Sequence, residues 1–166
     1  NFLFQPALRA ATKPYGSWTV KEPWTLTGWM AGLPEYDHGA LVMNLYKGKK
    51  IGNVVGWLGF VANAARGQHW HILGYPQGAR DLAQTPPGPQ FDGKHIEICA
   101  AAFATTDLPS GNPDLPATNG VGCDQTGGTS GGPWVVDFSG VGGATNFLNG
   151  NNSYRYNSPN PPENLK

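Results

Sequence analysis

Hydrophobic and polar residues alternate over short distances along this chain, and helical periodicity is scarce. Short runs rich in β-branched or aromatic residues, each bounded by Gly, Pro, Asn or Asp, predict β-strands. These runs are residues 37–46, 51–61, 69–75, 93–103 and 133–140. Because short strands follow one another through turns, the pattern predicts an all-β sandwich or barrel.

The segments between these runs are polar or short. Residues 64–68 ("AARGQ") have the composition of a single helical turn. Residues 105–122 are polar, contain several prolines and carry no core residues, so they are expected to form a loop. The tail, residues 157–166, is expected to be irregular or extended.

Composition narrows the function classes. The chain has 166 residues, with 11 basic and 11 acidic side chains, so electrostatics does not favour a nucleic-acid or membrane partner. It shows no transmembrane run and no signal peptide, and because it begins with Asn1 we expect a processed, excised or recombinant chain. With 24 Gly and 15 Pro but ample apolar residues, it is expected to be rich in turns rather than disordered.

The two cysteines allow two interpretations. Cys99 ends a strand-like run and Cys123 opens a glycine-rich loop, so a disulfide between them would brace that loop in a secreted protein. In the loop-entropy model, closing the segment between the two cysteines would add about 3 kcal/mol to the free energy of unfolding. The alternative is two reduced core cysteines in a cytosolic protein.

Residues 128–132 ("GTSGG") place Ser130 in a pattern shared by several serine hydrolases. In α/β-hydrolases the histidine follows the serine, but the last histidine here is His95, and a strand rather than a helix follows the loop. The subtilisin order is met nominally by Asp37, His71 and Ser130, but the chain shows no helices of the kind that connect parallel strands. The remaining order, His, Asp, Ser, belongs to double β-barrel proteases.

The stretch "TGGTSGGPW" resembles the nucleophile loop of the chymotrypsin-like (trypsin-fold) serine peptidases, most of all the bacterial and fungal branch related to glutamyl endopeptidases. Further similar motifs follow in that branch's order: "PYGSW", "EYDHGALVMNL", "VGWLGF", "HILGYPQG", "FDGKHIEIC" and "NGNNSY". The resemblance implies an all-β, chymotrypsin-like double β-barrel. Residues 1–62 would be the remainder of an incomplete N-terminal barrel, and residues 63–166 would form the C-terminal barrel with the nucleophile loop.

The same resemblance implies a secreted serine endopeptidase that cleaves peptide or protein substrates through an acyl-enzyme and needs no cofactor. Ser130 would be the nucleophile, Asp37 the acid of the triad, and the amides of Gly128 and Ser130 the oxyanion hole. For each residue there is a plainer interpretation: an idle serine in a glycine-rich turn, or an aspartate that caps a strand. Thr129 stands where many zymogens carry aspartate, so activation by a freed N-terminus is not expected.

The histidine of the triad is missing. Similar peptidases carry it before the aspartate, yet residues 1–36 contain no histidine. Three interpretations remain: the histidine lies on a separate companion chain, the sequence is a piece of a longer protease, or the protein is a non-catalytic binding protein on a peptidase scaffold. His38, next to Asp37, should point to the opposite strand face. His69 and His71 should share a strand face, without a third ligand for a metal.

The resemblance also suggests a substrate pocket. Asn152, Ser153 and Tyr154 would form its wall and the strand that pairs with the substrate backbone. Glutamyl endopeptidases tend to have histidine where Asn152 stands, which argues against strict glutamate preference. Asp124 lies six residues before Ser130, where trypsins place the carboxylate that selects basic residues, although a turn aspartate beside a disulfide explains it equally. His95 is expected in the strand that leads to Cys99, at a half-exposed position.

Overall fold

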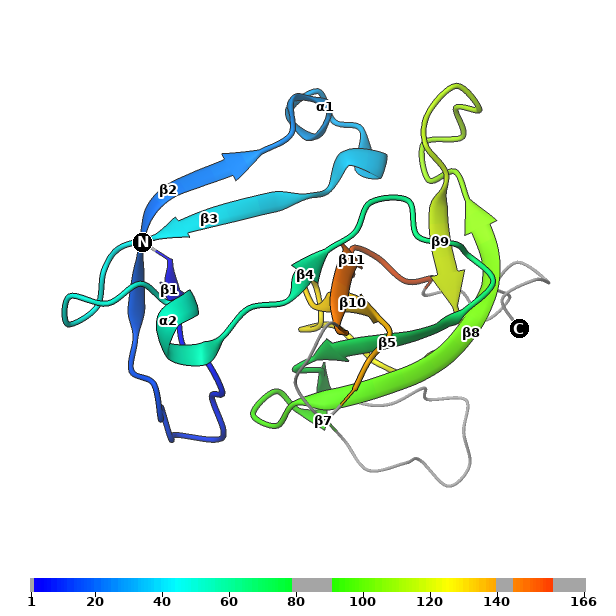
Figure 1. Cartoon of the computed structure of the whole chain (residues 1–166). Helices are drawn as coiled ribbons and strands as arrows, with labels where there is room; N and C mark the ends of the chain where they lie inside the picture. The colour runs from blue at the N-terminus through cyan, green and yellow to red at the C-terminus, as the bar shows by residue number, and fades with distance from the viewer. Residues whose placement is uncertain (1, 79–90, 140–144, 157–166) are drawn as a thin grey trace. The chain divides into compact units, whose positions relative to one another are not determined.

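The computed structural model describes residues 2–78, 91–139 and 145–156, and the expected extended tail at 157–166 lies outside them (Figure 1). The chain divides into two compact units, Asn1–Leu58 and Gly59–Lys166. The described residues form a three-stranded, a six-stranded and a two-stranded sheet with short helical turns between them. The all-β prediction is therefore confirmed.

The first unit is built on an antiparallel sheet with the strand order β1-β2-β3. The strands are β1 (Leu3–Phe4), β2 (Trp18–Thr25) and β3 (Gly39–Met43). Trp18 is buried, donates its indole N–H to the carbonyl of Tyr15 over 3.1 Å, and packs against the ring of Tyr46 with centroids 5.3 Å apart. This tryptophan is the centre of a small core.

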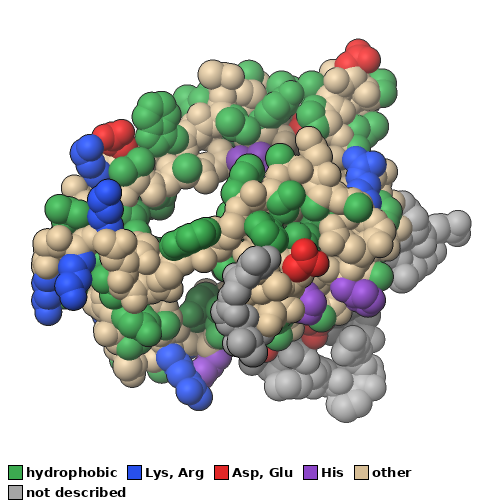
Figure 2. Space-filling view, viewed as in Figure 1, with side chains coloured by type: hydrophobic (Ala, Val, Ile, Leu, Met, Phe, Trp, Pro, Cys, Tyr) green, Lys and Arg blue, Asp and Glu red, His purple; other side chains and the backbone are tan. Residues whose placement is uncertain are grey.

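Most other large apolar side chains of the first unit are exposed. Both faces of β3 are open to solvent, with Leu41 47% and Val42 43% exposed. Trp57, after α2 (Gly52–Val55), is 84% exposed. Figure 2 shows many hydrophobic side chains at the visible surface. The exposed large apolar residues of this unit are Phe2, Leu3, Phe4, Tyr15, Trp24, Leu26, Trp29, Met30, Leu41, Val42, Leu45, Val55, Trp57 and Leu58.

The second unit is built on a sheet with the strand order β4-β11-β10-β5-β8-β9. In chain order, its strands are β4 (Gly59–Phe60), β5 (His69–Gly74), β8 (Glu97–Asp107), β9 (Thr118–Val121), β10 (Pro133–Val136) and β11 (Phe147–Asn151). All neighbouring strands are antiparallel except β11 and β4. A separate hairpin joins β6 (Gln77–Gly78) to β7 (Phe91–Asp92).

The core of this unit lies on one face of β5 and β10. Trp70, Ile72 and Val136 are buried, and Cys99 and Trp134 pack against them. Because strand side chains alternate between faces, burial of Trp70 and Ile72 turns His69 and His71 to the other face, as the sequence predicted. This core holds the strands that flank the glycine-rich loop.

Several predicted elements differ from the structure. Residues 51–61 contain the helical turn α2 and the short strand β4 rather than one strand. Ile51, Val54 and Val55 have the i, i+3, i+4 spacing of a helical turn, and Gly56, at φ 75°, ends it. Residues 64–68 form bends and no helix. Local apolar content alone did not distinguish these short elements.

The predicted loop at 105–122 was also partly wrong. It includes the end of β8 and all of β9, which pair from Phe103 with Val121 to Asp107 with Thr118. Polar residues can form such strands because the partner strand satisfies their backbone groups. The sequence also did not predict β2 and β11, whereas β3, β5 and β10 lie inside the predicted runs. No helix in the described ranges is long and apolar enough to cross a membrane.

Candidate active site

Ser130 lies in the turn that enters β10, in the second unit, and its side chain is exposed. Within the described residues of that unit, its hydroxyl forms no hydrogen bond. Asp37 lies in the first unit, half-buried between the 3₁₀ turn η1 (Pro34–Tyr36) and β3. The predicted nucleophile and the predicted acid therefore belong to different units.

The glycines around Ser130 are required by the backbone. Gly128 has a φ of +100°, and a Cβ there would lie 2.6 Å from the carbonyl oxygen of Tyr75. Gly131 has a φ of +77°. Side chains are strongly disfavoured at both positions, because L-residues rarely adopt these angles. The glycine pattern read from the sequence thus describes a defined turn rather than a flexible linker.

The backbone amides of this turn fall into two classes. Gly131 donates to the carbonyl of Asn152 over 2.8 Å, and Gly132 donates to the carbonyl of Thr129 over 2.8 Å. Among the residues that the structure describes, the amides of Gly128 and Ser130 donate no backbone hydrogen bond. These two amides are the ones that the sequence analysis assigned to an oxyanion hole, and they remain available as donors to a ligand.

Threonine side chains hold the start of the loop. Thr126 is buried and donates its hydroxyl to the carbonyl of Gln77 over 2.9 Å, while the Gln77 amide donates to the carbonyl of Gly127 over 2.7 Å. Thr129 donates its hydroxyl to the carbonyl of Thr126 over 3.0 Å. The loop is therefore ordered by its own hydroxyls and by β6, which gives Thr129 a structural role in place of an aspartate.

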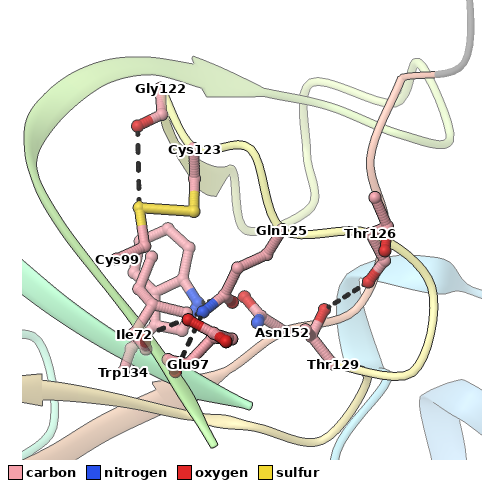
Figure 3. Close-up of a disulfide and its surroundings, with 10 residues drawn as sticks. All are labelled: Ile72, Glu97, Cys99, Gly122, Cys123, Gln125, Thr126, Thr129, Trp134 and Asn152. Atoms are coloured by element: carbon pink, nitrogen blue, oxygen red, sulfur yellow. Dashed lines mark hydrogen bonds between the residues drawn. A yellow bond between two sulfur atoms is a disulfide. The ribbon is translucent and has the colours of Figure 1, made fainter. Parts of the chain in front are cut away.

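A disulfide and a glutamine brace the loop from the other side (Figure 3). Cys99 and Cys123 form the predicted disulfide, with Cα atoms 6.1 Å apart. The side-chain amide of Gln125 donates to the carbonyls of Ile72 and Glu97, each over 3.2 Å. Gln125 thus ties the loop to β5 and β8, a role that no sequence motif had indicated, because both partners are backbone atoms far away in the chain.

The predicted pocket residues have specific partners. The side-chain oxygen of Asn152 accepts a hydrogen bond from the indole N–H of Trp134 over 2.6 Å. The backbone amide of Asn152 donates to the carbonyl of Gly132 over 2.9 Å. β11 ends at Asn151, so residues 152–154 do not form the expected strand. Ser153 is half-buried, and the Tyr154 hydroxyl contacts Asp107. Asp124, next to the disulfide, is exposed.

Asp37 is positioned by the connection between β2 and β3. The helical turn α1 (Thr27–Met30) packs closely on η1, because a Cβ at Gly28 would lie 2.5 Å from the ring of Tyr36. The Asp37 amide then donates to the carbonyl of Pro34 over 3.2 Å. His38, like Asp37, precedes β3, so the argument that strand geometry separates their side chains does not apply.

The other histidines occupy different environments. His69 is exposed, and His71 stacks on Phe138 with ring centroids 4.8 Å apart. The Nδ1 atom of His71 is buried without a hydrogen-bond partner among the described residues. Among the described residues, no group of three or more His, Cys, Asp or Glu side chains is placed so that it could bind a metal ion.

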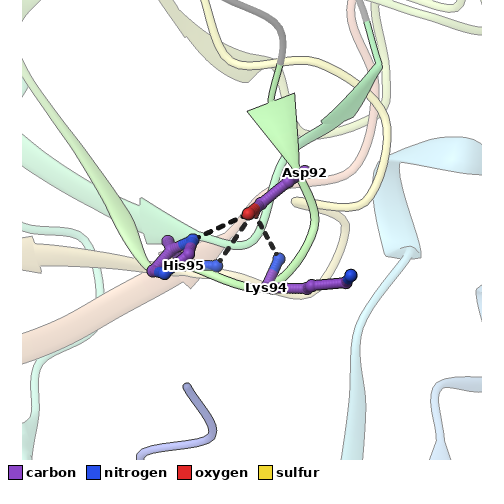
Figure 4. A network of polar contacts seen from close by, with 3 residues as sticks. All are labelled: Asp92, Lys94 and His95. Atoms are coloured by element: carbon purple, nitrogen blue, oxygen red, sulfur yellow. Dashed lines mark hydrogen bonds and ion pairs between the residues drawn. The ribbon is translucent and has the colours of Figure 1, made fainter. Parts of the chain in front are cut away.

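His95 lies in the turn before β8 rather than in the strand, which corrects the prediction (Figure 4). Its Nδ1 lies 2.8 Å from a carboxylate oxygen of Asp92, while the amides of Lys94 and His95 donate to the other oxygen. The backbone bond from Lys94, followed by the contacts with His95, lowers the pKa of Asp92 below its ordinary value. Because the pair is exposed and belongs to a turn, it stabilises the β7–β8 connection locally.

No protein-family model matches the chain, and no curated protein sequence matches it significantly. Two crystal structures are similar over 95% of it: the protease Anisep from Arthrobacter nicotinovorans, with 38% identity and a TM-score of 0.75, and the thermostable serine protease AL20 from an extremophilic microorganism, with 31% identity and a TM-score of 0.72. The chain spans 64% and 65% of those two chains. The chymotrypsin-like fold is thereby confirmed, although neither larger sheet closes into a barrel within the described residues.

Proposed function

We propose that this chain is the nucleophile-bearing part of a secreted serine endopeptidase. One observation carries the proposal: the exposed Ser130 stands in a turn whose glycines leave the amides of Gly128 and Ser130 available for a ligand oxygen. The likeness to two proteases supports the same class of function. The membership in the branch related to glutamyl endopeptidases remains part of this proposal.

In the proposed reaction, the Ser130 oxygen attacks the carbonyl carbon of a peptide bond and gives its proton to a histidine. The carbonyl oxygen becomes an oxyanion, which the amides of Gly128 and Ser130 stabilise. The C–N bond then breaks, the histidine protonates the leaving amine, and an acyl ester remains on Ser130. Water cleaves this ester through the same base, and Asp37 orients the histidine throughout.

We further propose that the histidine comes from a companion segment that adds to the first unit. Among the described residues, β3 pairs with β2 alone, so one edge of β3 offers unpaired backbone groups. Beside it lies a groove of about 620 Å³, whose lining combines apolar residues such as Leu41, Met43 and Trp57 with Lys21 and Lys50. The two similar protease chains extend beyond the part that this chain spans, which is consistent with such a segment. An apolar strand with a histidine after small residues fits this surface.

Secretion rests on the Cys99–Cys123 disulfide, because such bonds persist mainly in oxidising compartments. The substrate preference is part of the same proposal. The side chain of Asn152 is held by Trp134, and a neutral amide offers no positive charge to a substrate carboxylate. Asp124 is the only acidic residue in the loop from Cys123 to Gly132. If the enzyme prefers substrates with a basic residue before the cleaved bond, the Asp124 carboxylate would be the group that binds that residue.

The alternative is a non-catalytic binding protein on the same scaffold. It is favoured by one observation, namely that within the described residues of the second unit no base forms a hydrogen bond with the Ser130 hydroxyl. A fluorophosphonate distinguishes the two proposals, because it labels an activated serine only. The test compares the chain alone, the protein purified under native conditions, and its Ser130→Ala variant.

We expect labelling of the native preparation, no labelling of Ser130→Ala, and no labelling of the isolated chain. Denaturing mass spectrometry of the native preparation should then reveal a second polypeptide, or a longer chain, that supplies the histidine. Labelling of the isolated 166-residue chain would rule out the companion segment. A native preparation that binds peptides but is never labelled would favour the binding protein.

A further inference from the structure

A carboxylate at the end of β8 holds two tyrosines that follow the predicted pocket residues. Tyr154 donates its hydroxyl to Oδ2 of Asp107 over 2.7 Å, and Tyr156 donates to the same oxygen. The hydroxyl of Thr118, on β9, lies 2.6 Å from the Tyr154 hydroxyl. Tyr154 gives its single proton to Asp107, and the adjacent Thr118 hydroxyl also donates to the backbone carbonyl of Asp107 over 3.2 Å. The two tyrosine rings meet edge to face, with centroids 6.1 Å apart.

Side chains rather than a strand ladder define the course of this segment. The strand β11 ends at Asn151, and Asn152 still pairs through its backbone with Gly131 and Gly132. Residues 153–156 belong to no helix or strand. Beyond Asn152, the contacts at Tyr154 and Tyr156 therefore attach the segment to the β8–β9 hairpin.

The ionisation of the three groups agrees with this geometry. Burial, followed by the hydrogen bond to Asp107 and the charge of that carboxylate, raises the pKa of Tyr154 well above its ordinary value. The hydrogen bond to Asp107 raises the pKa of Tyr156 to about 12. Burial opposes ionisation of Asp107, but the hydrogen bonds from Tyr156 and Tyr154 outweigh it and lower its pKa. Over the physiological pH range Asp107 is therefore ionised and both tyrosines are neutral, as the hydrogen bonds between them require.

We infer that Asp107 is a positioning residue for substrate binding: by holding Tyr154 and Tyr156, it fixes the path of residues 152–156, along which the substrate backbone lies. The inference rests on the proposed function, because it takes the segment after Asn152 as the one that binds the substrate backbone. Because Asp107 acts through the two tyrosines that it holds, its loss is expected to change substrate affinity and to leave the chemical step unchanged.

The test compares Asp107→Ala with Asp107→Asn and with Asp114→Ala in the natively purified enzyme. Asparagine keeps an acceptor oxygen for the tyrosines, and Asp114 is an exposed aspartate in the β8–β9 connection whose loss changes the charge equally. Ultraviolet titration should show two late-titrating tyrosines in the wild type and Asp114→Ala. In Asp107→Ala, Tyr156 should titrate near pH 10, and Tyr154, whose pKa burial also raises, should titrate earlier than in the wild type. Hydrogen exchange at residues 153–156 should become faster in Asp107→Ala alone.

Substrate kinetics completes the test. With the peptide that the wild type cleaves best in a mixed library, we expect Asp107→Ala to raise KM about tenfold at unchanged kcat, since two side chains must be ordered on binding. Asp107→Asn should recover most of the affinity, and fluorophosphonate labelling should be the same in all variants. An Asp107→Ala enzyme with wild-type KM, or with unchanged tyrosine titration, would overturn the inference while leaving the protease function standing. If the wild type itself neither cleaves nor is labelled, the proposed function fails first, and the tyrosine titration still decides whether Asp107 holds the segment.

Discussion

The indole N–H of Trp134 donates a 2.6 Å hydrogen bond to the side-chain oxygen of Asn152. Trp134 follows the Ser130 loop on β10, and Asn152 follows β11, so this bond joins the two segments that the proposed protease uses for attack and for substrate binding. The backbone pairing of Asn152 with Gly131 and Gly132 lies beside it. The side chain that the sequence placed in a pocket wall therefore also secures the loop.

Replacing Asn152 with alanine should destabilise the second unit. The change leaves the part-buried indole N–H of Trp134 without its acceptor, which typically costs about 1–3 kcal/mol. Urea unfolding followed by tryptophan fluorescence measures the loss. Asn152→Asp keeps an acceptor oxygen and should lose less, and equal losses in both variants would show that the hydrogen bond contributes little.

Replacing Gly128 with alanine should disrupt the loop. The Cβ would lie 2.6 Å from the Tyr75 carbonyl oxygen at a φ of +100°, so the turn must shift, at a cost of about 1–3 kcal/mol. Displacement of one oxyanion donor would lower the rate of serine labelling by about 10²-fold or more. Gly127→Ala is the matched control, because a Cβ there meets no atom within 4 Å and its φ is not left-handed. Equal labelling of the two variants would contradict the assigned role.

Removing the Cys99–Cys123 disulfide should lower the free energy of unfolding by about 3 kcal/mol, as expected when a closed segment with a sequence separation of 24 is released. The double variant Cys99→Ala/Cys123→Ala can be compared with the oxidised wild type in urea. Intact-mass measurement after alkylation, with and without reduction, checks the bond itself. Two alkylated thiols in the non-reduced native protein would be inconsistent with the structure.

Alkaline pH should lower the free energy of unfolding because Tyr154 and Tyr156 ionise. Both pKa values are raised in the folded state, that of Tyr156 to about 12, so their contribution to stability is complete below pH 10 and is lost as the pH rises toward 12. Urea midpoints measured between pH 9 and pH 12 should therefore fall in the wild type. Asp107→Ala should show a smaller fall over this range, because the hydrogen bonds to Asp107 that raise the pKa values of both tyrosines are gone and only the effect of burial remains.

Cleavage of a mixed peptide library should not be dominated by glutamate before the scissile bond. In the proposed pocket, Asn152 would stand where glutamyl endopeptidases tend to have histidine, and its side chain accepts a hydrogen bond from Trp134. Mass-spectrometric identification of the products decides the preference. Products that follow Glu almost exclusively would show the inference to be wrong, and products that follow Arg or Lys would make Asp124 a pocket residue, which Asp124→Ala would then test.

Local sequence determined the features that depend on one or a few neighbouring residues. Gly128 and Gly131 occupy backbone angles that other residues avoid, so the turn that carries Ser130 could be predicted before any contact was known. The alternation of buried Trp70 and Ile72 with His69 and His71 follows from strand geometry in the same way. The strand β9 has no clear period and was misjudged because its pairing with β8 decides it, whereas α2 was missed although its spacing is that of a helical turn.

The tertiary structure alone decided which distant side chains meet. Gln125 reaches the backbone of Ile72 and Glu97, Asn152 reaches Trp134, and Asp107 reaches Tyr154 across a separation of 47 residues. These contacts follow from the strand order, which sets β10 between β5 and β11 and pairs β8 with both β5 and β9. A local pattern predicts that a residue lies in a strand or turn, but the order of strands depends on the total free energy of packing the whole unit. The turn that carries Ser130 could therefore be predicted from the sequence, and a nucleophilic role proposed for it, whereas the network that holds its loop and the segment after Asn152 could not.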